Sequence, residues 1–267
     1  MDTVSTYVHG YSEVEARRLG DQADTLAELL HAGTAYSAGS RVLEVGCGVG
    51  AQTPHLLAAS PGADLVAVDI SEDSLAQARA RVNDPRVQWH RADLFALPFA
   101  EASFDHLFVC FVLEHLPDPE KALLRLGKLL RPGGTITVIE GDHGSAFFHP
   151  RSDFAQAAID CLIRVQAAAD GDALIGRRLQ PLLTGAGYRD VVARPRTVYA
   201  DPTRPDLAEG FTRRTFTAMV DAVRDDALAA GLITRADWDR GIADLRRVAD
   251  EGTFHYVFFK AQAVRPG

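Results

Sequence analysis

A glycine-rich segment after an apolar stretch is the part of this chain whose residue types most clearly predict ligand chemistry. Residues 42–51 read VLEVGCGVGA, so a predicted strand ends in Gly46, Gly48 and Gly50. Glycine adopts positive φ without a Cβ clash, and it lets peptide N–H groups come within hydrogen-bonding distance of a ligand. A helical pattern follows from Gln52 to Ala59. This order of strand, loop and helix is typical of sites for a nucleotide-containing cofactor.

Two acidic residues lie near this loop in the sequence. Glu44 stands two residues before the first glycine, and Asp69 ends the next apolar stretch. A carboxylate at the second position can accept hydrogen bonds from both ribose hydroxyls. Because Gly46, Gly48 and Ala51 also fit the dinucleotide pattern G-x-G-x-x-G/A, these residues alone leave a nicotinamide or flavin cofactor open.

Six segments between Arg41 and Asp142 carry a resemblance to a known family. In chain order they are EVGCGVG at 44–50, VDIS at 68–71, ADL at 92–94, FD at 104–105, LEHL at 113–116 and LRPGG at 130–134. In these segments and in their order, the chain resembles the class I S-adenosylmethionine-dependent methyltransferases. A nicotinamide oxidoreductase would share the glycine loop and Asp69, but it would give the ADL and LRPGG segments no purpose.

The resemblance implies S-adenosyl-L-methionine as the cofactor and assigns residues to it. Asp69 would hold the ribose, and Asp93 would bind the adenine amino group. Leu94 and Ile70 would pack on the adenine faces, with Phe111 beside the methionine half. The full set of expected cofactor-binding residues is Tyr7, Tyr11, Glu44, Gly46, Gly48, Gly50, Asp69, Ile70, Asp93, Leu94 and Phe111.

Two tyrosines lie ahead of the first predicted helix, in the sequence YVHGYSE. Ser12 and Glu15 match the capping-box pattern for the start of that helix. Tyr7 or Tyr11 could close over the cofactor, by bonding its carboxylate or by placing a ring face on the sulfonium. Alternatively, both rings could be ordinary aromatic packing that holds the helix down.

Polar residues around the end of the predicted fifth strand are the candidates for acid–base chemistry. Glu140, Asp142 and His143 should face the methyl donor, where a carboxylate or an imidazole could orient an acceptor or remove its proton. His115, in the LEHL segment, is a further catalytic candidate. Each of these residues could instead cap a loop or helix. Together with His149, Asp142 and His143 have metal-ligand chemistry, but their spacing matches no metal motif, so we predict no metal site.

The whole-chain resemblance favours a small-molecule acceptor. As a whole, the chain resembles small-molecule methyltransferases, including tailoring enzymes of bacterial secondary metabolism. Within this group it resembles an indole C-methyltransferase of the physostigmine type. In that reaction carbon 3 of the indole is the nucleophile, and the ring N–H proton leaves to a nearby base. O- or N-methylation of another small metabolite, and a module that binds the cofactor without catalysis, stay open. Six aromatic residues could line the acceptor pocket or pack in the core: Phe147, Phe148, Phe154, Phe211, Phe216 and Trp238.

Charge and composition narrow the class of partner. The formal net charge is −8 and the arginine pairs are scattered, which argues against a nucleic-acid partner. No apolar run reaches the length of a membrane span and nothing resembles a signal peptide, so we expect a soluble, cytoplasmic protein. Cys47, Cys110 and Cys161 form no C-x-x-C pair and are expected as buried thiols. The expected partner is a small-molecule acceptor, and a homo-oligomer that exchanges its terminal segment or lid between subunits stays open.

Apolar stretches and helical patterns alternate along the chain, which predicts an α/β fold. The expected strands lie near 42–45, 64–68, 87–90, 106–111, 135–140, 188–199 and 253–263. This order predicts a Rossmann-like, seven-stranded, mostly parallel sheet with helices on both faces. Four regions are expected: a helical N-terminal cap at 1–39, a cofactor-binding α/β core at 40–200, a helical lid insertion at 201–252 and the final strand of the core at 253–267.

Overall fold

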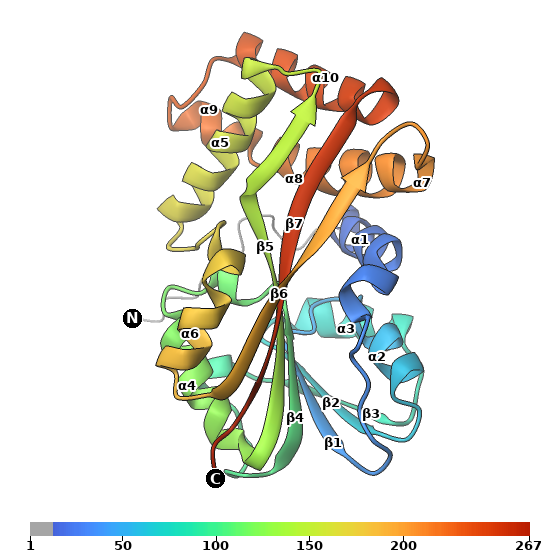
Figure 1. Cartoon of the computed structure of the whole chain (residues 1–267), viewed down its shortest axis with the longest axis vertical. Helices are drawn as coiled ribbons and strands as arrows, with labels where there is room; N and C mark the ends of the chain where they lie inside the picture. Colours follow the sequence, from blue (N-terminus) through green and yellow to red (C-terminus); the bar gives the residue numbers. More distant parts are fainter. Residues whose placement is uncertain (1–12) are drawn as a thin grey trace.

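The computed structural model describes residues 13–267, and one seven-stranded sheet forms its centre (Figure 1). The strands lie in the order β3-β2-β1-β4-β5-β7-β6; β7 is antiparallel to both of its neighbours, and the other pairings are parallel. The bounds are β1 Arg41–Val45, β2 Asp64–Asp69, β3 Val87–Arg91, β4 Phe104–Cys110, β5 Leu130–His149, β6 Arg189–Ala200 and β7 Thr253–Val264. The predicted Rossmann-like, mostly parallel sheet is confirmed.

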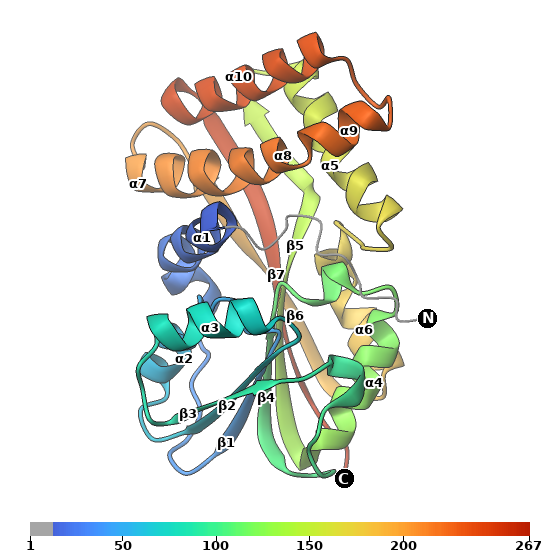
Figure 2. The same ribbon diagram turned by 180° about the vertical axis from the view of Figure 1, so that it is seen from behind.

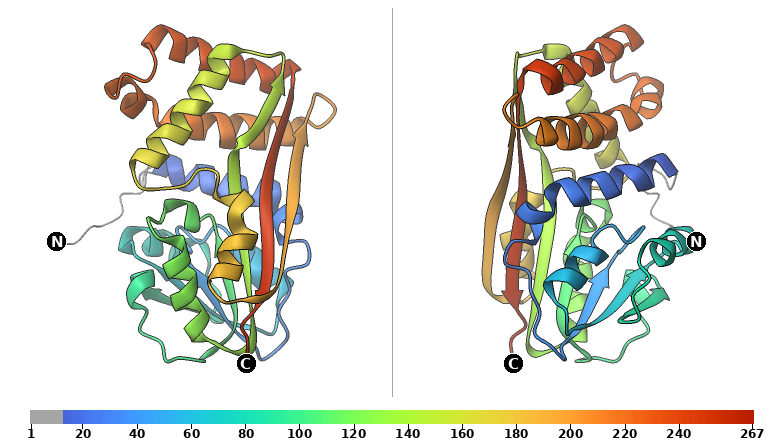
Figure 3. Two further views of the ribbon diagram at one scale, coloured as in Figure 1. Left: turned by 60° about the vertical axis from the view of Figure 1, so that its left-hand side comes forward. Right: turned by 90° about the vertical axis from the view of Figure 1, so that its right-hand side faces the viewer.

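Helices cover both faces of the sheet. Figure 3 shows α1, α2 and α3 on one face and α4 and α6 on the other. Their bounds are α1 Glu13–His31, α2 Thr53–Ala59, α3 Glu72–Arg81, α4 Pro119–Leu129, α5 Asp153–Ala168 and α6 Leu179–Gly185. Short 3-10 turns are η1 Leu94–Ala96, η2 Leu113–His115 and η3 Ile175–Arg178. Within residues 13–267, none of the helices is both long and apolar enough to cross a membrane.

Alternate residues of the central strands build two apolar cores, one on each face. In β1, Val42 belongs to the core that includes Leu30 of α1, whereas Leu43 belongs to the core that includes Leu123 and Leu126 of α4. Successive side chains of a strand point to opposite faces, and a parallel sheet covered on both faces must be apolar on both. For this reason the central strands are continuous apolar runs in the sequence.

The fifth strand is much longer than the sequence predicts. We expected this strand near 135–140, but β5 continues to His149. The added part pairs with β7, with Asp142 opposite Val257 and Phe148 opposite Phe254, and one register shift lies between Asp142 and Phe147. This pairing with β7 is what makes the segment a strand, because it binds backbone groups that a loop would leave to solvent. The predicted end of this strand near residue 140 was therefore wrong.

The segment between β6 and β7 forms a helical layer of its own. It contains α7 Pro205–Leu207, the π-helix η4 Ala208–Thr217, α8 Ala218–Ala222, α9 Arg224–Ala229 and α10 Arg235–Glu251. Figure 2 shows these helices with α5 at the far ends of β5 and β7, and α1 between them and α2 and α3. Trp238 of α10 is completely buried, and its Nε1 donates to Asp221 Oδ1 at 3.2 Å. Trp238 is thus a core residue of this layer.

Candidate active site

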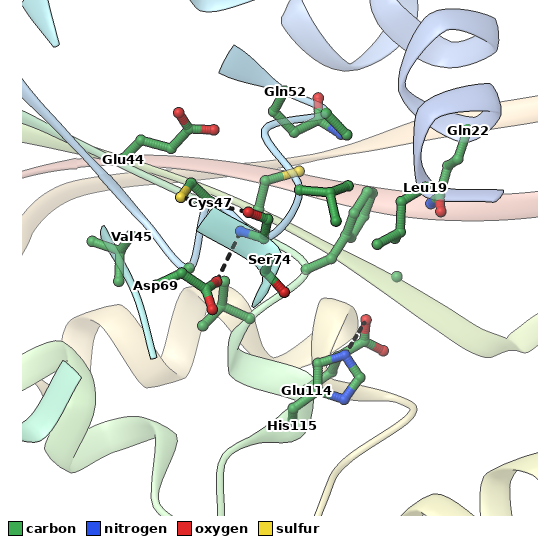
Figure 4. Close-up of a pocket in the computed structure, with 18 of the residues that line it drawn as sticks. Leu19, Gln22, Glu44, Val45, Cys47, Gln52, Asp69, Ser74, Glu114 and His115 are labelled. Atoms are coloured by element: carbon green, nitrogen blue, oxygen red, sulfur yellow. Dashed lines mark hydrogen bonds and ion pairs between the residues drawn. The ribbon is translucent and has the colours of Figure 1, made fainter. Parts of the chain in front are cut away.

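A cavity of about 710 Å³ lies at the carboxyl ends of β1, β2 and β4. The glycine loop after β1 forms one wall, and residues of α1, η2, η4 and β7 form the others. Open α/β sheets bind their ligands at the carboxyl ends of the strands, and small-molecule sites have volumes of roughly 300–1,000 Å³. We therefore take this cavity, shown in part in Figure 4, as the candidate active site.

Most of the residues that the sequence singled out reach this cavity. Those that line it are Glu44, Gly46, Gly48, Asp69, Ile70, Asp93, Leu94, Phe111, His115 and His143. Gly50, Glu140 and Asp142 do not belong to its lining. Tyr7 and Tyr11 lie outside the described residues, so their predicted contact with a cofactor stays a prediction.

The glycine loop has backbone angles that favour glycine at each of its three positions. The φ angles of Gly46, Gly48 and Gly50 are 66°, 52° and 69°. A Cβ on Gly46 would lie 2.5 Å from a methyl group of Val112, and one on Gly50 would lie 3.0 Å from the Cβ of Ala78. A Cβ on Gly48 would meet nothing within 4 Å, so open space lies in front of this residue. Gly50 serves helix packing, whereas Gly48 leaves room for a ligand.

The two predicted acceptors are buried beside this loop. Asp69 accepts hydrogen bonds from the backbone N–H groups of Gly48 (2.8 Å) and Ser71 (2.9 Å). Thr53 Oγ1 donates to Glu44 Oε2 at 2.8 Å. Burial raises the pKa of Asp69, and burial together with the nearby Asp69 raises the pKa of Glu44 to about 8. Asp69 thus holds the loop in shape and still faces the cavity (Figure 4).

The cavity lining also includes apolar side chains and one backbone outlier. Asp93 accepts a hydrogen bond from the N–H of Phe95 at 2.8 Å and so caps η1, which presents Leu94 to the cavity. Ile70 is 45% exposed, as expected of an apolar side chain that faces an open cavity. Phe111 has a φ of 58°, which is unfavourable for an aromatic residue and is typical of functional positions.

Glu140 does not occupy the position of a general base. It is fully buried in β5, and its Oε1 accepts hydrogen bonds from the backbone N–H groups of Val112 (3.0 Å) and Leu113 (2.8 Å). Burial, and the nearby Glu114, raise the pKa of Glu140 well above its ordinary value. The geometry therefore argues against direct acid–base work, because this carboxylate fixes the turn between β4 and η2.

Asp142 is also engaged away from the cavity. Its two carboxylate oxygens accept hydrogen bonds from Arg177 Nε (2.8 Å) and Nη2 (2.6 Å), a bidentate ion pair. Successive residues of β5 point to opposite faces, so Asp142 points away from the face on which His143 reaches the cavity. A role for Asp142 as a base is not supported by this placement.

The cavity instead brings two imidazoles together around a carboxylate. Glu114 Oε1 lies 3.6 Å from Nε2 of His115, and Glu114 Oε2 lies 3.7 Å from Nε2 of His143. The other ring nitrogen of His143, Nδ1, is 2.7 Å from the hydroxyl of Tyr256. Figure 4 shows the carboxylate of Glu114 beside His115. Both histidines were predicted from the sequence, whereas Glu114 was not, although its place next to His115 in LEHL was a signal.

Aromatic rings form the wall next to His143. Phe211 and Phe216 of η4 lie with their ring centroids 5.4 and 5.5 Å from that of Tyr256, and Phe258 completes the group at 4.7 Å from Tyr256. In a π-helix the backbone bonds join residues i and i+5, so these two phenylalanines present rings on about the same side. Phe147, by contrast, is 61% exposed and stacks on His255 outside the cavity.

Comparison with protein families agrees with this geometry. Residues 43–138 match the family model described as "Methyltransferase domain". The matched range contains the glycine loop, Asp69, Asp93 and Glu114, and it ends inside β5.

Two curated relatives illustrate the likeness. The chain is 33% identical to "Methyltransferase GfsG" of Streptomyces halstedii over 126 residues, which are 46% of this chain and 45% of that protein. It is 26% identical over 260 residues to "27-O-demethylrifamycin SV methyltransferase" of Amycolatopsis mediterranei, which covers 95% of this chain and 88% of that one. The chain spans about half the length of the first curated relatives it matches, 45% of one and 53% of another.

A solved structure gives the same fold. Phosphoethanolamine N-methyltransferase 2 of Haemonchus contortus, in complex with S-adenosyl-L-methionine, superposes with a TM-score of 0.58 at 18% identity. The match covers 93% of this chain and 57% of that one. At this identity the likeness concerns the fold alone.

Proposed function

We propose that residues 43–138, which match a methyltransferase domain, bind S-adenosylmethionine as a class I methyltransferase does, and that the chain methylates a small aromatic acceptor in the cavity described above. The observation that carries the proposal is the composition of that cavity's lining. It combines the glycine loop, Asp69 and Asp93 with a group of aromatic rings beside His143. A cofactor and an acceptor would thus share one enclosed space.

The cofactor half fits an adenosyl group in shape and in polarity. Gly48 leaves open space, and Asp69 offers carboxylate oxygens to the ribose hydroxyls. Asp93 would bind the adenine amino group, and the exposed Ile70 with Leu94 would enclose the ring. When bound, S-adenosylmethionine supplies an electrophilic methyl group on a sulfonium that is already a good leaving group.

The acceptor half fits a flat apolar molecule with one polar hydrogen. Phe211, Phe216, Tyr256 and Phe258 would contact the faces and edges of an aromatic ring, and His143 lies next to them. An indole has this combination of an apolar ring and one N–H donor. Transfer to carbon 3 of an indole, with loss of the N–H proton, is the reaction we propose first; O- or N-methylation of a related molecule is the alternative.

The protein's contribution to such a transfer is alignment and exclusion of water. An in-line displacement needs the acceptor atom, the methyl carbon and the sulfur in one line, and correct positioning alone can supply about 7–11 kcal/mol of the barrier. Residues of α1, of η4 and of α8 line the cavity, and η4 and α8 belong to the helical segment at 201–252. We therefore propose that this helical segment acts as the roof of the active site.

Calorimetric titration with S-adenosylhomocysteine, and in parallel with NAD, tests the cofactor part of the proposal. We expect binding of S-adenosylhomocysteine and none of NAD. A panel of indoles and phenols with methyl-labelled S-adenosylmethionine then tests the acceptor part. Absence of S-adenosylhomocysteine binding would overturn the roles of Asp69 and Asp93. Binding without methylation of any aromatic acceptor would remove the aromatic acceptor but leave the cofactor site.

A further inference from the structure

Glu114 is a carboxylate inside the cavity, held where chemistry between cofactor and acceptor would take place. It belongs to η2, directly after β4, and its side chain is 10% exposed, through the cavity that it lines. Glu140 is engaged by the backbone of η2 and Asp142 by Arg177. Glu15 of α1 also lines the cavity, and both of its carboxylate oxygens accept hydrogen bonds from Arg18. Among Glu114, Glu140 and Asp142, Glu114 is the acid that lines the cavity.

The position of Glu114 is fixed by contacts from three segments. Its backbone carbonyl accepts hydrogen bonds from the N–H of Asp172 (2.8 Å) and from Gln166 Nε2 (3.1 Å). Gln166 Nε2 also donates to Glu114 Oε2 at 3.2 Å. The buried Glu140 anchors the start of the same turn through Val112 and Leu113. A side chain held in this way loses little conformational freedom when a ligand binds to it.

The carboxylate retains hydrogen-bonding capacity toward the cavity. An ionised carboxylate has about four acceptor sites, and within residues 13–267 Gln166 supplies the one hydrogen bond to it. The two imidazole nitrogens lie at 3.6 and 3.7 Å, beyond the usual N–H···O range of about 2.7–3.2 Å. Nε2 of His143 is buried and has no hydrogen-bond partner among the described residues. These groups can tighten around a bound molecule.

We propose that Glu114 is the catalytic base, with His143 and His115 as positioning residues for its carboxylate. The proposal rests on the proposed function. As the electron pair of the acceptor forms a bond to the methyl carbon, the bond from that carbon to sulfur breaks and its electron pair stays on sulfur. The acceptor's N–H or O–H proton moves to Glu114, which becomes a neutral carboxylic acid. The positive charge of the sulfonium is thereby replaced by a proton on the protein.

The surrounding charges agree with this assignment. Burial lowers the pKa of both His115 and His143, whereas the charge of Glu114 acts in the opposite direction on both. Arg18 of α1 further lowers both values, and it is itself bound by Glu15; Asp142, on β5, raises that of His143. Imidazoles with lowered pKa values are neutral at neutral pH and are weaker proton acceptors. They can solvate Glu114 without cancelling its charge.

The first test compares Glu114→Gln with the wild type, using the indole or phenol that the wild type methylates. We expect kcat to fall by about 100- to 10,000-fold, with affinity for S-adenosylhomocysteine nearly unchanged. Glu101→Gln is the matched control, because Glu101 is exposed in a turn and distant from the cavity. In Glu114→Ala, added formate should restore part of the activity. A kcat of Glu114→Gln within threefold of the wild type overturns the proposal.

A second test needs no acceptor. The proton titrations of the histidine side chains are followed by NMR in the wild type and in Glu114→Gln, with His115→Asn and His143→Asn for assignment. Loss of the carboxylate charge should move the titration midpoints of both imidazoles to lower pH. If neither midpoint moves, the cluster is overturned. Failure of the wild type to bind S-adenosylhomocysteine would instead overturn the proposed function, so the two failures are distinguishable.

Discussion

Replacement of Asp69 by alanine tests the cofactor half of the site most directly. The carboxylate would bind the ribose, and a hydrogen bond to a charged group contributes about 1.5–3 kcal/mol. At about 1.4 kcal/mol per factor of ten, Asp69→Ala should weaken S-adenosylhomocysteine binding by roughly 10- to 150-fold. Isothermal titration calorimetry measures this change.

The same substitution also affects the free protein, because Asp69 binds the N–H groups of Gly48 and Ser71. By analogy with a lost helix cap, the free energy of unfolding should fall by about 1–2 kcal/mol. In a protein of this size, that corresponds to a decrease in Tm of about 2–8 °C, which is measurable by calorimetry.

Thr234→Ala separates the two effects. Thr234 caps α10 by accepting a hydrogen bond from the N–H of Asp237 at 3.2 Å, away from the cavity lining. Its loss should destabilise the fold by about 1 kcal/mol and leave the ligand affinity unchanged. If Asp69→Ala weakens S-adenosylhomocysteine binding no more than Thr234→Ala does, the assignment of Asp69 to the ribose is refuted.

Two further predictions concern stability. Burial raises the pKa of Glu44 to about 8, so between about pH 4.5 and 8 the folded state binds more protons than the unfolded state and the free energy of unfolding falls as pH rises. In urea unfolding, Glu44→Gln should lose less free energy of unfolding between pH 6 and pH 8 than the wild type does. An equal loss in both proteins would contradict the burial argument. Phe216→Ala removes a completely buried ring and should lower the free energy of unfolding by about 3–5 kcal/mol. Phe147→Ala, at a residue that is 61% exposed, should change it by less than about 0.5 kcal/mol. Similar losses in both variants would argue against the aromatic wall as a packed unit.

The sheet and the glycine loop were predictable because their signals are local. The apolar runs mark the central strands, and Gly46, Gly48 and Gly50 mark a loop that requires positive φ at each position. These features depend on a few consecutive residues, so one sequence is enough to find them.

The roles of the carboxylates were not predictable, because they depend on segments far apart in the chain. Glu140 binds the backbone of Val112 and Leu113, and β5 extends to His149 through its pairing with β7, which begins at Thr253. The sequence around Glu140 contains no sign of either contact. It therefore favoured Glu140 as a base, whereas the structure gives it a supporting position.

The π-helix η4 was also not predictable from the sequence, for a physical reason. Phe211 and Phe216 are five residues apart, a spacing that an ordinary α-helix does not place on one face. Only packing against Tyr256 and Phe254 shows that both rings are needed on the same side.

The long ladder between β5 and β7 has a mechanical consequence. The same two strands run through the sheet beside β4 and β6 and continue to the helical layer, so hydrogen-bonded backbone joins these two parts of the molecule. A hinge needs a few residues that can change φ and ψ freely, and a hydrogen-bonded ladder restricts them. The helical layer should therefore be rigid. It would select acceptors by the shape of a preformed cavity, and acceptors and products would bind and leave without a large movement of its helices.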